Sequence, residues 1–244
     1  MKSLIPTNWA VPSRFRSRLG ETAGRQRAMA DEGHLLLVLH AVPEPGDSAR
    51  GARLFWRDPK GGWRSNSQGA GVAPLRTHHQ QFEDAVDTLE RKLSVASQAQ
   101  EYFEVLRAAT PLLRTARNLH RTMQEAREAC DDRELINLRD RAGEVERALE
   151  LVVGEAKDGL DYTVARRAEE QAALSLKLSQ HSNKLNVIAA VFLPITALTS
   201  IFSMTLRSGL EGFADPYVFW SVVGFGAALA LTLERTLNKV ETPT

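Results

Sequence analysis

The sequence has little that would place it outside the cell or in contact with nucleic acid. Its only cysteine, Cys130, cannot form an intramolecular disulfide, and no asparagine stands in an N-x-Ser/Thr motif. Both absences favour a reducing compartment, so we expect most of the chain to lie in the cytoplasm. The 31 Lys and Arg residues against 30 Asp and Glu residues give a net charge of +1. This balance shows no basic excess, and we predict no nucleic-acid partner.

Common enzyme motifs are absent as well. The sequence has no nucleophile elbow and no Walker, HExxH or CxxC spacing, and Gly69 and Gly71 lack the rest of a nucleotide-binding fingerprint. With 244 residues, the chain allows one domain with an appendage or two small domains. We therefore expect neither an enzyme nor a covalently bound cofactor.

Two uncharged apolar runs stand near the C-terminal end of the sequence. The first, at 185–206, would be about 33 Å long as a helix, and a hydrocarbon core is about 30 Å thick. The second runs from Pro216 to Leu233. Such runs predict two transmembrane helices, at 185–206 and 216–235, joined by an external loop at 207–215. The alternative is a buried helical hairpin in a large soluble core.

Basic residues predict the orientation of these two helices. Lys177 and Lys184 precede the first run, Arg235 and Lys239 follow the second, and the connecting loop has only Arg207. The positive-inside rule then places both termini in the cytoplasm. The sequence therefore predicts a multi-pass protein of the inner or plasma membrane, in contact with the lipid bilayer, with a cytoplasmic tail at 236–244.

The rest of the chain divides by pattern. Residues 1–75 are rich in proline and glycine and predict a small α+β cytoplasmic head, with a hairpin around Pro59 and Gly61. Residues 76–132 have helical periodicity and predict antiparallel cytoplasmic helices, the first of them capped by Thr77 and Gln80.

From residue 133 the helical pattern becomes regular. Apolar residues alternate by three and four as in a coiled-coil seam: Leu135, Leu138, Ala142, Val145, Leu149, Val152 and Ala156. We expect a stalk helix at 133–184 that continues without a break to about Thr205. The predicted fold class is a mainly α membrane protein with a small α+β cytoplasmic head, a helical bundle, a very long stalk helix continuous with the first transmembrane helix, and a second transmembrane helix.

This organisation resembles the CorA family of divalent-metal channels. Residues Asn183–Thr205 (NKLNVIAAVFLPITALTSIFSMT) are similar to the pore helix of that family, with Pro194 at the position of its in-span proline, and the stretch 135–162 resembles the start of its stalk. The family ends its pore helix with Gly-Met-Asn, whereas this sequence has Ser203, Met204 and Thr205. The resemblance implies a homo-oligomer, a pentamer, that transports Mg²⁺ or another divalent cation.

One stripe on the first apolar run favours a conducting role. The residues that would line a central axis are Ser182, Leu185, Ala189, Leu193, Thr196, Ser200 and Ser203. Thr205 would then contact the metal ion at the pore mouth, where Glu211 and Asp215 supply negative charge. Packing between helices is the alternative explanation for small and hydroxylated residues. Because the Gly and Asn of the signature are missing, a non-conducting, membrane-anchored helical scaffold remains the alternative function.

Two further groups of residues are weaker candidates for metal binding. His78 and His79 precede Glu83 at ligand-like spacing, but they stand in a polar stretch, and we favour a solvent-exposed surface. Four aspartates could hold regulatory Mg²⁺ between protomers, as the resemblance suggests, although helix caps and surface charges explain them better: Asp131, Asp132, Asp158 and Asp161.

Overall fold

The computed structural model describes most of the chain, and it divides into two compact units, Met1–Arg166 and Arg167–Thr244. The described residues are 4–43, 51–67, 69, 71–203, 217, 220, 221, 223–226, 228 and 232. One helix, α4, contributes residues to both units.

The first unit contains a four-stranded antiparallel sheet in the order β1-β2-β3-β4. Its strands are β1 (Arg27–Asp31), β2 (His34–His40), β3 (Ala52–Arg57) and β4 (Trp63–Ser65). Glu32 and Gly33 connect β1 to β2, both with positive φ (48° and 78°), as a tight two-residue hairpin requires. The β3–β4 hairpin predicted around Pro59 and Gly61 is confirmed, with Phe55 opposite Ser65 in its register.

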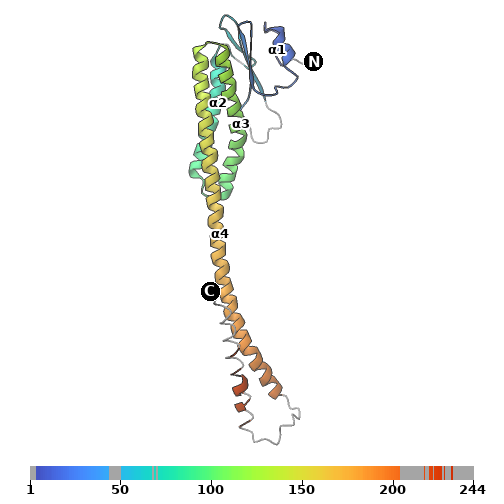
Figure 1. The fold of residues 1–244 in the computed structure, drawn as a ribbon, viewed down its shortest axis with the longest axis vertical. Helices are drawn as coiled ribbons and strands as arrows, with labels where there is room; N and C mark the ends of the chain where they lie inside the picture. The colour runs from blue at the N-terminus through green and yellow to red at the C-terminus, as the bar shows by residue number, and fades with distance from the viewer. Residues whose placement is uncertain are drawn as a thin grey trace. The chain divides into compact units, whose positions relative to one another are not determined.

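The sheet lies between the helices and the N-terminal segment (Figure 1), and alternation along its strands gives it two buried faces. Leu35, Leu37 and Leu39 point toward the helices, whereas Leu36 and Val38 point the other way. The second face is covered by the N-terminal segment, which includes the short helix α1 (Ser13–Arg18). A strand that is buried on both faces has a continuous run of apolar residues, which explains the sequence LLLVL in β2.

Helix α3 (Ala99–Ala129) packs on this first face against β1 and β2, and α2 (Ala73–Val95) and the N-terminal part of α4 (Arg133–Ser203) contribute to the same core. The predicted seam of α4 is buried: its seven residues from Leu135 to Ala156 are at most 5% exposed and belong to the same core as the sheet. The helix predicted over 133–205 is present up to Ser203, and Thr205 lies outside the described residues.

The start of α2 differs from the one that the sequence predicted. Helix α2 begins at Ala73, one turn before the expected cap at Thr77, because Pro74 is favourable in a first turn. In α3 the capping box is formed by Gln98 and Glu101. Before α4, Asp132 Oδ1 accepts the backbone N–H of Glu134 at 3.0 Å. The side chains of Gln98, Glu101 and Asp132 accept backbone N–H groups that would otherwise lack a partner, and Pro74 has no N–H to satisfy.

The predicted fold class, a mainly α membrane protein, is wrong for the described residues. Among them, no helix combines the length and the apolar character needed to cross a membrane. The prediction rested on missing charges, but the predicted span at 185–206 also carries polar side chains on α4 such as Asn186, Thr196 and Ser200. The predicted loop at 207–215 and most of 216–235 lie outside the described residues. The described fold is an α+β unit followed by a long helix.

Candidate functional site on helix α4

The candidate site is the stripe that the sequence predicted along the C-terminal part of α4. Its described side chains are all exposed in the single chain: Ser182, Leu185, Ala189, Leu193, Thr196 and Ser200. Ser203 is the last residue of α4. Thr205, Glu211 and Asp215, predicted at the pore mouth, lie outside the described residues. The structure thus presents the stripe on one helix and leaves the predicted mouth undescribed.

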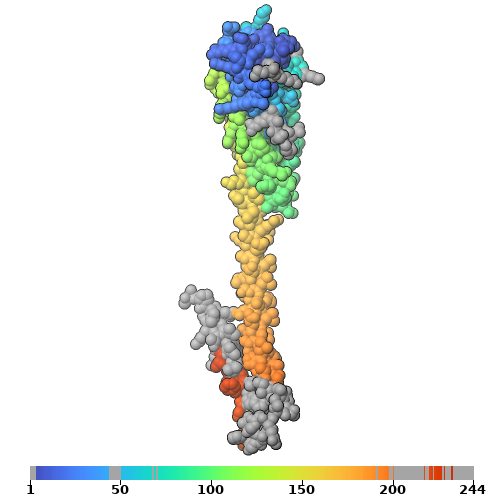
Figure 2. Space-filling view, turned by 90° about the vertical axis from the view of Figure 1, so that its right-hand side faces the viewer, coloured from blue at the N-terminus to red at the C-terminus, as the bar shows by residue number. Residues whose placement is uncertain are grey.

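The stripe is apolar to an extent that is unusual for a surface. Leu185 is 66% exposed and Leu193 is 67% exposed, and the neighbouring Ile188 and Phe192 are 53% and 65% exposed. Figure 2 shows this part of α4, coloured orange, with its side chains at the surface. Contiguous exposed apolar side chains mark interaction surfaces. This part of α4 therefore offers a face for a partner.

Oxygen-bearing side chains interrupt the apolar residues of this stripe. The Thr196 hydroxyl donates to the carbonyl of Phe192 at 2.8 Å, so its oxygen keeps lone pairs that can accept from a water molecule. Nearer the start of the stripe, an open hollow of about 480 Å³ is lined by Leu176, Ser179, Gln180, Ser182, Asn183 and Asn186. Mg²⁺ gives up its water shell reluctantly, and amide and hydroxyl oxygens of this kind can contact such a hydrated cation.

The histidine pair proposed as a solvent-exposed surface is buried instead. His78 is 3% exposed and His79 is 1% exposed. Burial lowers the pKa of His78 to about 3 and that of His79 to about 4, so both rings are neutral at pH 7. His79 Nδ1 donates to the carbonyl of Leu75 at 2.9 Å, which fixes its tautomer. The expectation failed because His78 and His79 share the helical face of Phe82, Val86 and Leu89, which packs into the core.

The acidic residues considered as metal ligands are either paired with arginines or exposed to solvent. Glu83 is paired with Arg141, whose Nε lies 2.6 Å from Oε1. Asp132 is paired with Arg57 at 3.0 Å, while Asp158 and Asp161 are exposed on α4. Across the part of the chain that the structure describes, no three His, Cys, Asp or Glu side chains form a group that could hold a metal ion.

Comparison with known protein families identifies the chain. The profile of the CorA-like Mg²⁺ transporter proteins matches residues 72–237, which is more than half of the sequence. The chain belongs to this CorA-like family. The proteins of this family are transporters and not enzymes. The predicted family and the predicted absence of enzymatic activity are therefore both confirmed. No curated protein matches the chain.

Two solved structures are similar to this CorA-like chain in fold. The full-length CmaX protein matches with a TM-score of 0.56 and 14% identity, over 95% of this chain and 83% of CmaX. The ZntB cytoplasmic domain from Vibrio parahaemolyticus RIMD 2210633 matches with a TM-score of 0.52 and 14% identity, over 66% of this chain and 80% of that domain. At these identities, the likeness concerns the fold alone.

Proposed function

We propose that the chain is one subunit of a homo-oligomeric CorA-like transporter of divalent cations, with Mg²⁺ as the first candidate ion and a pentamer as the assembly. The observation that carries this proposal is the family match over residues 72–237. It is supported by the exposed stripe on α4, whose leucines at 66% and 67% exposure need a second surface to cover them.

In the proposed assembly, the stripes of several copies face a common axis. Hydroxyl oxygens such as that of Thr196 would meet the water shell of a cation, while the leucines between them would pack against neighbouring copies. Thr205 is proposed as the metal-contacting residue at the mouth of this path. Glu211 and Asp215 would attract cations there, because together they outweigh the charge of Arg207.

We also propose that the transporter acts at the cell membrane with both termini on the cytoplasmic side. A single free cysteine, Cys130, suits a reducing compartment. The basic residues Lys177 and Lys184 on α4 suit the proximity of anionic lipid headgroups.

A non-conducting scaffold is the second candidate function, and one observation favours it. The chain has Ser203 and Thr205 where the Gly-Met-Asn signature has glycine and asparagine. A serine restricts the backbone more than glycine does, and a threonine hydroxyl offers a weaker dipole to a cation than an amide carbonyl. A chain that kept the fold and lost this signature would assemble without conducting.

Mg²⁺ uptake into proteoliposomes tests the two functions. The purified full chain and the double variant Ser203→Gly/Thr205→Asn are reconstituted around a Mg²⁺-sensitive dye. We expect flux above empty liposomes for the native chain and a larger flux for the double variant, because amide carbonyls replace hydroxyls at the mouth.

The matched control for this test is Thr88→Asn/Ser94→Gly, which makes the same chemical changes on the exposed face of α2 and should leave flux unchanged. If native chain and double variant both stay at the empty-liposome baseline while the oligomer remains intact, the scaffold function holds instead.

A further inference from the structure

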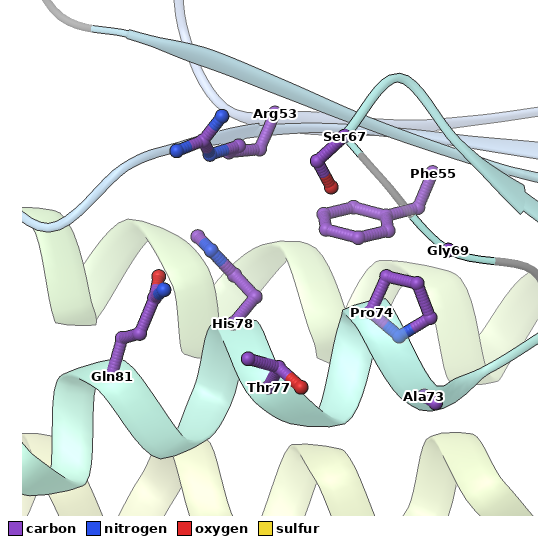
Figure 3. Close-up of a pocket in the computed structure, with 9 residues that line it drawn as sticks. All are labelled: Arg53, Phe55, Ser67, Gly69, Ala73, Pro74, Thr77, His78 and Gln81. Atoms are coloured by element: carbon purple, nitrogen blue, oxygen red, sulfur yellow. The ribbon is translucent and has the colours of Figure 1, made fainter.

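A separate pocket lies between β3 and α2 in the first unit. Its volume is about 310 Å³, near the lower end of the range for small-molecule sites. Arg53 and Phe55 project from β3, since residues two apart on a strand share a face. Thr77 and His78 come from α2 and close the opposite wall (Figure 3). The pocket is formed by one unit and needs no second copy.

His78 is the unusual residue of this pocket. Its ring is 3% exposed, and among the described residues neither Nδ1 nor Nε2 has a hydrogen-bond partner. The ring packs against Phe55 and Phe82, with centroids 5.6 Å and 5.3 Å away, and points from α2 toward Arg53 (Figure 3). A neutral imidazole has one N–H donor and one acceptor, and buried polar groups are normally satisfied. A ligand in the pocket would supply the missing partner.

The electrostatics of the pocket favour an anion. Arg53 is the charged residue that lines it, and no acidic side chain is among its described lining residues. Among the ion pairs of the described residues, none involves Arg53. Burial, and then the neighbouring His79 and Arg53, lower the pKa of His78 to about 3, so the ring is a neutral donor at pH 7. Arg53 would repel a cation in the pocket, and no acidic side chain among the described lining residues would offset this repulsion.

The start of α2 also borders the pocket. Ala73 and Pro74, in the first turn of the helix, line it, but Pro74 has no N–H, and the N–H groups of Leu75 and Arg76 donate to the carbonyl of Val72 at 3.0 and 3.1 Å. The helix end therefore contributes the partial positive charge of its dipole and few free donors, so Arg53 and His78 are the groups that would hold an anion. Phe55 and Pro74 also offer an apolar surface beside the polar groups. The site therefore combines an anion-binding end with an apolar side.

We propose that this pocket binds the oxyanion group, a carboxylate or a phosphate, of a small molecule. Arg53 pairs with the oxyanion, the N–H of His78 donates a hydrogen bond to it, and Phe55 with Pro74 contacts any apolar part. This site is independent of the proposed transport, because it uses no residue of the stripe on α4. It gives the first unit a ligand of its own.

Histidine-selective NMR of the full chain tests the site. The chain is labelled with ¹⁵N-histidine, the His78 signals are assigned by their loss in His78→Gln, and inorganic phosphate and benzoate are titrated at pH 7 and constant ionic strength. We expect a saturable shift of the His78 signals with at least one of the two anions. A response to phosphate alone indicates a phosphate ligand, and a response to benzoate alone indicates a carboxylate with an apolar part. Benzamide, the neutral analogue of benzoate, should cause no saturable shift.

Two arginine variants distinguish this site from general attraction of anions. Arg53→Gln should weaken binding by about tenfold, because it removes a charge-assisted hydrogen bond, and Arg53→Lys should restore part of the affinity. Arg64→Gln is the matched control: Arg64 lies over the Trp56 ring at 5.5 Å, on the other face of the sheet, and its loss should leave affinity unchanged. The proposal is overturned if neither anion causes a saturable shift of His78, or if Arg53→Gln and Arg64→Gln weaken binding equally.

Discussion

Two stretches of α4 contain apolar residues at the same spacing of three and four but meet different surroundings. From Leu135 to Ala156 the seam is buried in the core of the first unit, and its residues are at most 5% exposed. From Leu185 to Leu193 comparable leucines are 66% and 67% exposed. Sequence periodicity defines an apolar face in both stretches. Only the structure shows which face finds a partner within the chain.

The difference separates two tasks of one helix. The covered seam contributes to the free energy of folding of the first unit, because its side chains leave water when the chain folds. The exposed stripe contributes nothing comparable in the single chain, and its apolar surface becomes useful only when a second surface covers it. Substitutions of equal chemistry in the two stretches should therefore have unequal consequences.

The largest expected effect is the loss of stability from a truncation in the seam. Leu149 is fully buried, so Leu149→Ala should lower the free energy of unfolding by about 2–5 kcal/mol, through lost apolar contact and a cavity. Leu185→Ala, the matched change in the stripe, should lower it by less than about 0.5 kcal/mol under conditions where the chain is monomeric. Denaturant unfolding followed by circular dichroism measures both. Equal losses would show that the stripe is covered within the chain, contrary to the comparison.

Acid should weaken the first unit through its buried histidines. The pKa of His78 is about 3 and that of His79 about 4 in the folded chain, against 6.5 for an unperturbed ring. Below pH 6.5 the unfolded chain therefore binds protons that the folded chain does not. The free energy of unfolding should fall as the pH drops from 6.5 toward 4, on the order of 3 kcal/mol for His79.

The contribution of one histidine is isolated by a variant that does not titrate. His78 faces Arg53, and His79 faces Arg141, Glu83 and Glu134. His78→Gln should show a shallower loss of stability between pH 6.5 and 4.5 than the native chain, whereas the exposed His181→Gln should keep the native slope. Parallel pH profiles for all three proteins would contradict the assignment of this sensitivity to the buried ring.

The fold of the first unit was largely accessible from sequence where the pattern was local. The seam of α4 and the β3–β4 hairpin follow from periodicity and from turn residues such as Gly61, whose φ is +87°. The strand β1 was missed because Arg27–Asp31 is short and mostly half-buried, so it shows no clear alternation. Only the structure shows that this segment is a strand, because it pairs with β2, with Ala28 opposite Leu37.

The candidate site was predictable in part. Spacing along α4 gave the positions of the stripe, because a continuous helix fixes which residues share a face. The pocket beside His78 was not predictable, since it joins Arg53 on a strand to a histidine on a helix across a tertiary contact. His78 lies four residues before Phe82 and so shares its buried face, but the polar residue type outweighed this spacing in the sequence-based interpretation.

The smallest expected effect concerns the polar contacts of the same helices. Arg141 on α4 holds Glu83 on α2 by two bonds, Nε to Oε1 at 2.6 Å and Nη2 to Oε2 at 2.7 Å, but the two side chains are 32% and 27% exposed. A partly exposed bidentate pair contributes about 1 kcal/mol at most, so a double-mutant cycle with Arg141→Gln and Glu83→Gln should give a coupling of about 0.5–1 kcal/mol that falls with added salt. Arg139→Gln, which removes the contact between sequence neighbours Arg139 and Asp140, is the control and should cost almost nothing. If the Arg141 variant lost as much stability as Leu149→Ala, ion pairing would hold α4 to the first unit as strongly as the apolar seam does, and burial of the seam would not by itself explain the contrast between the two stretches of the helix.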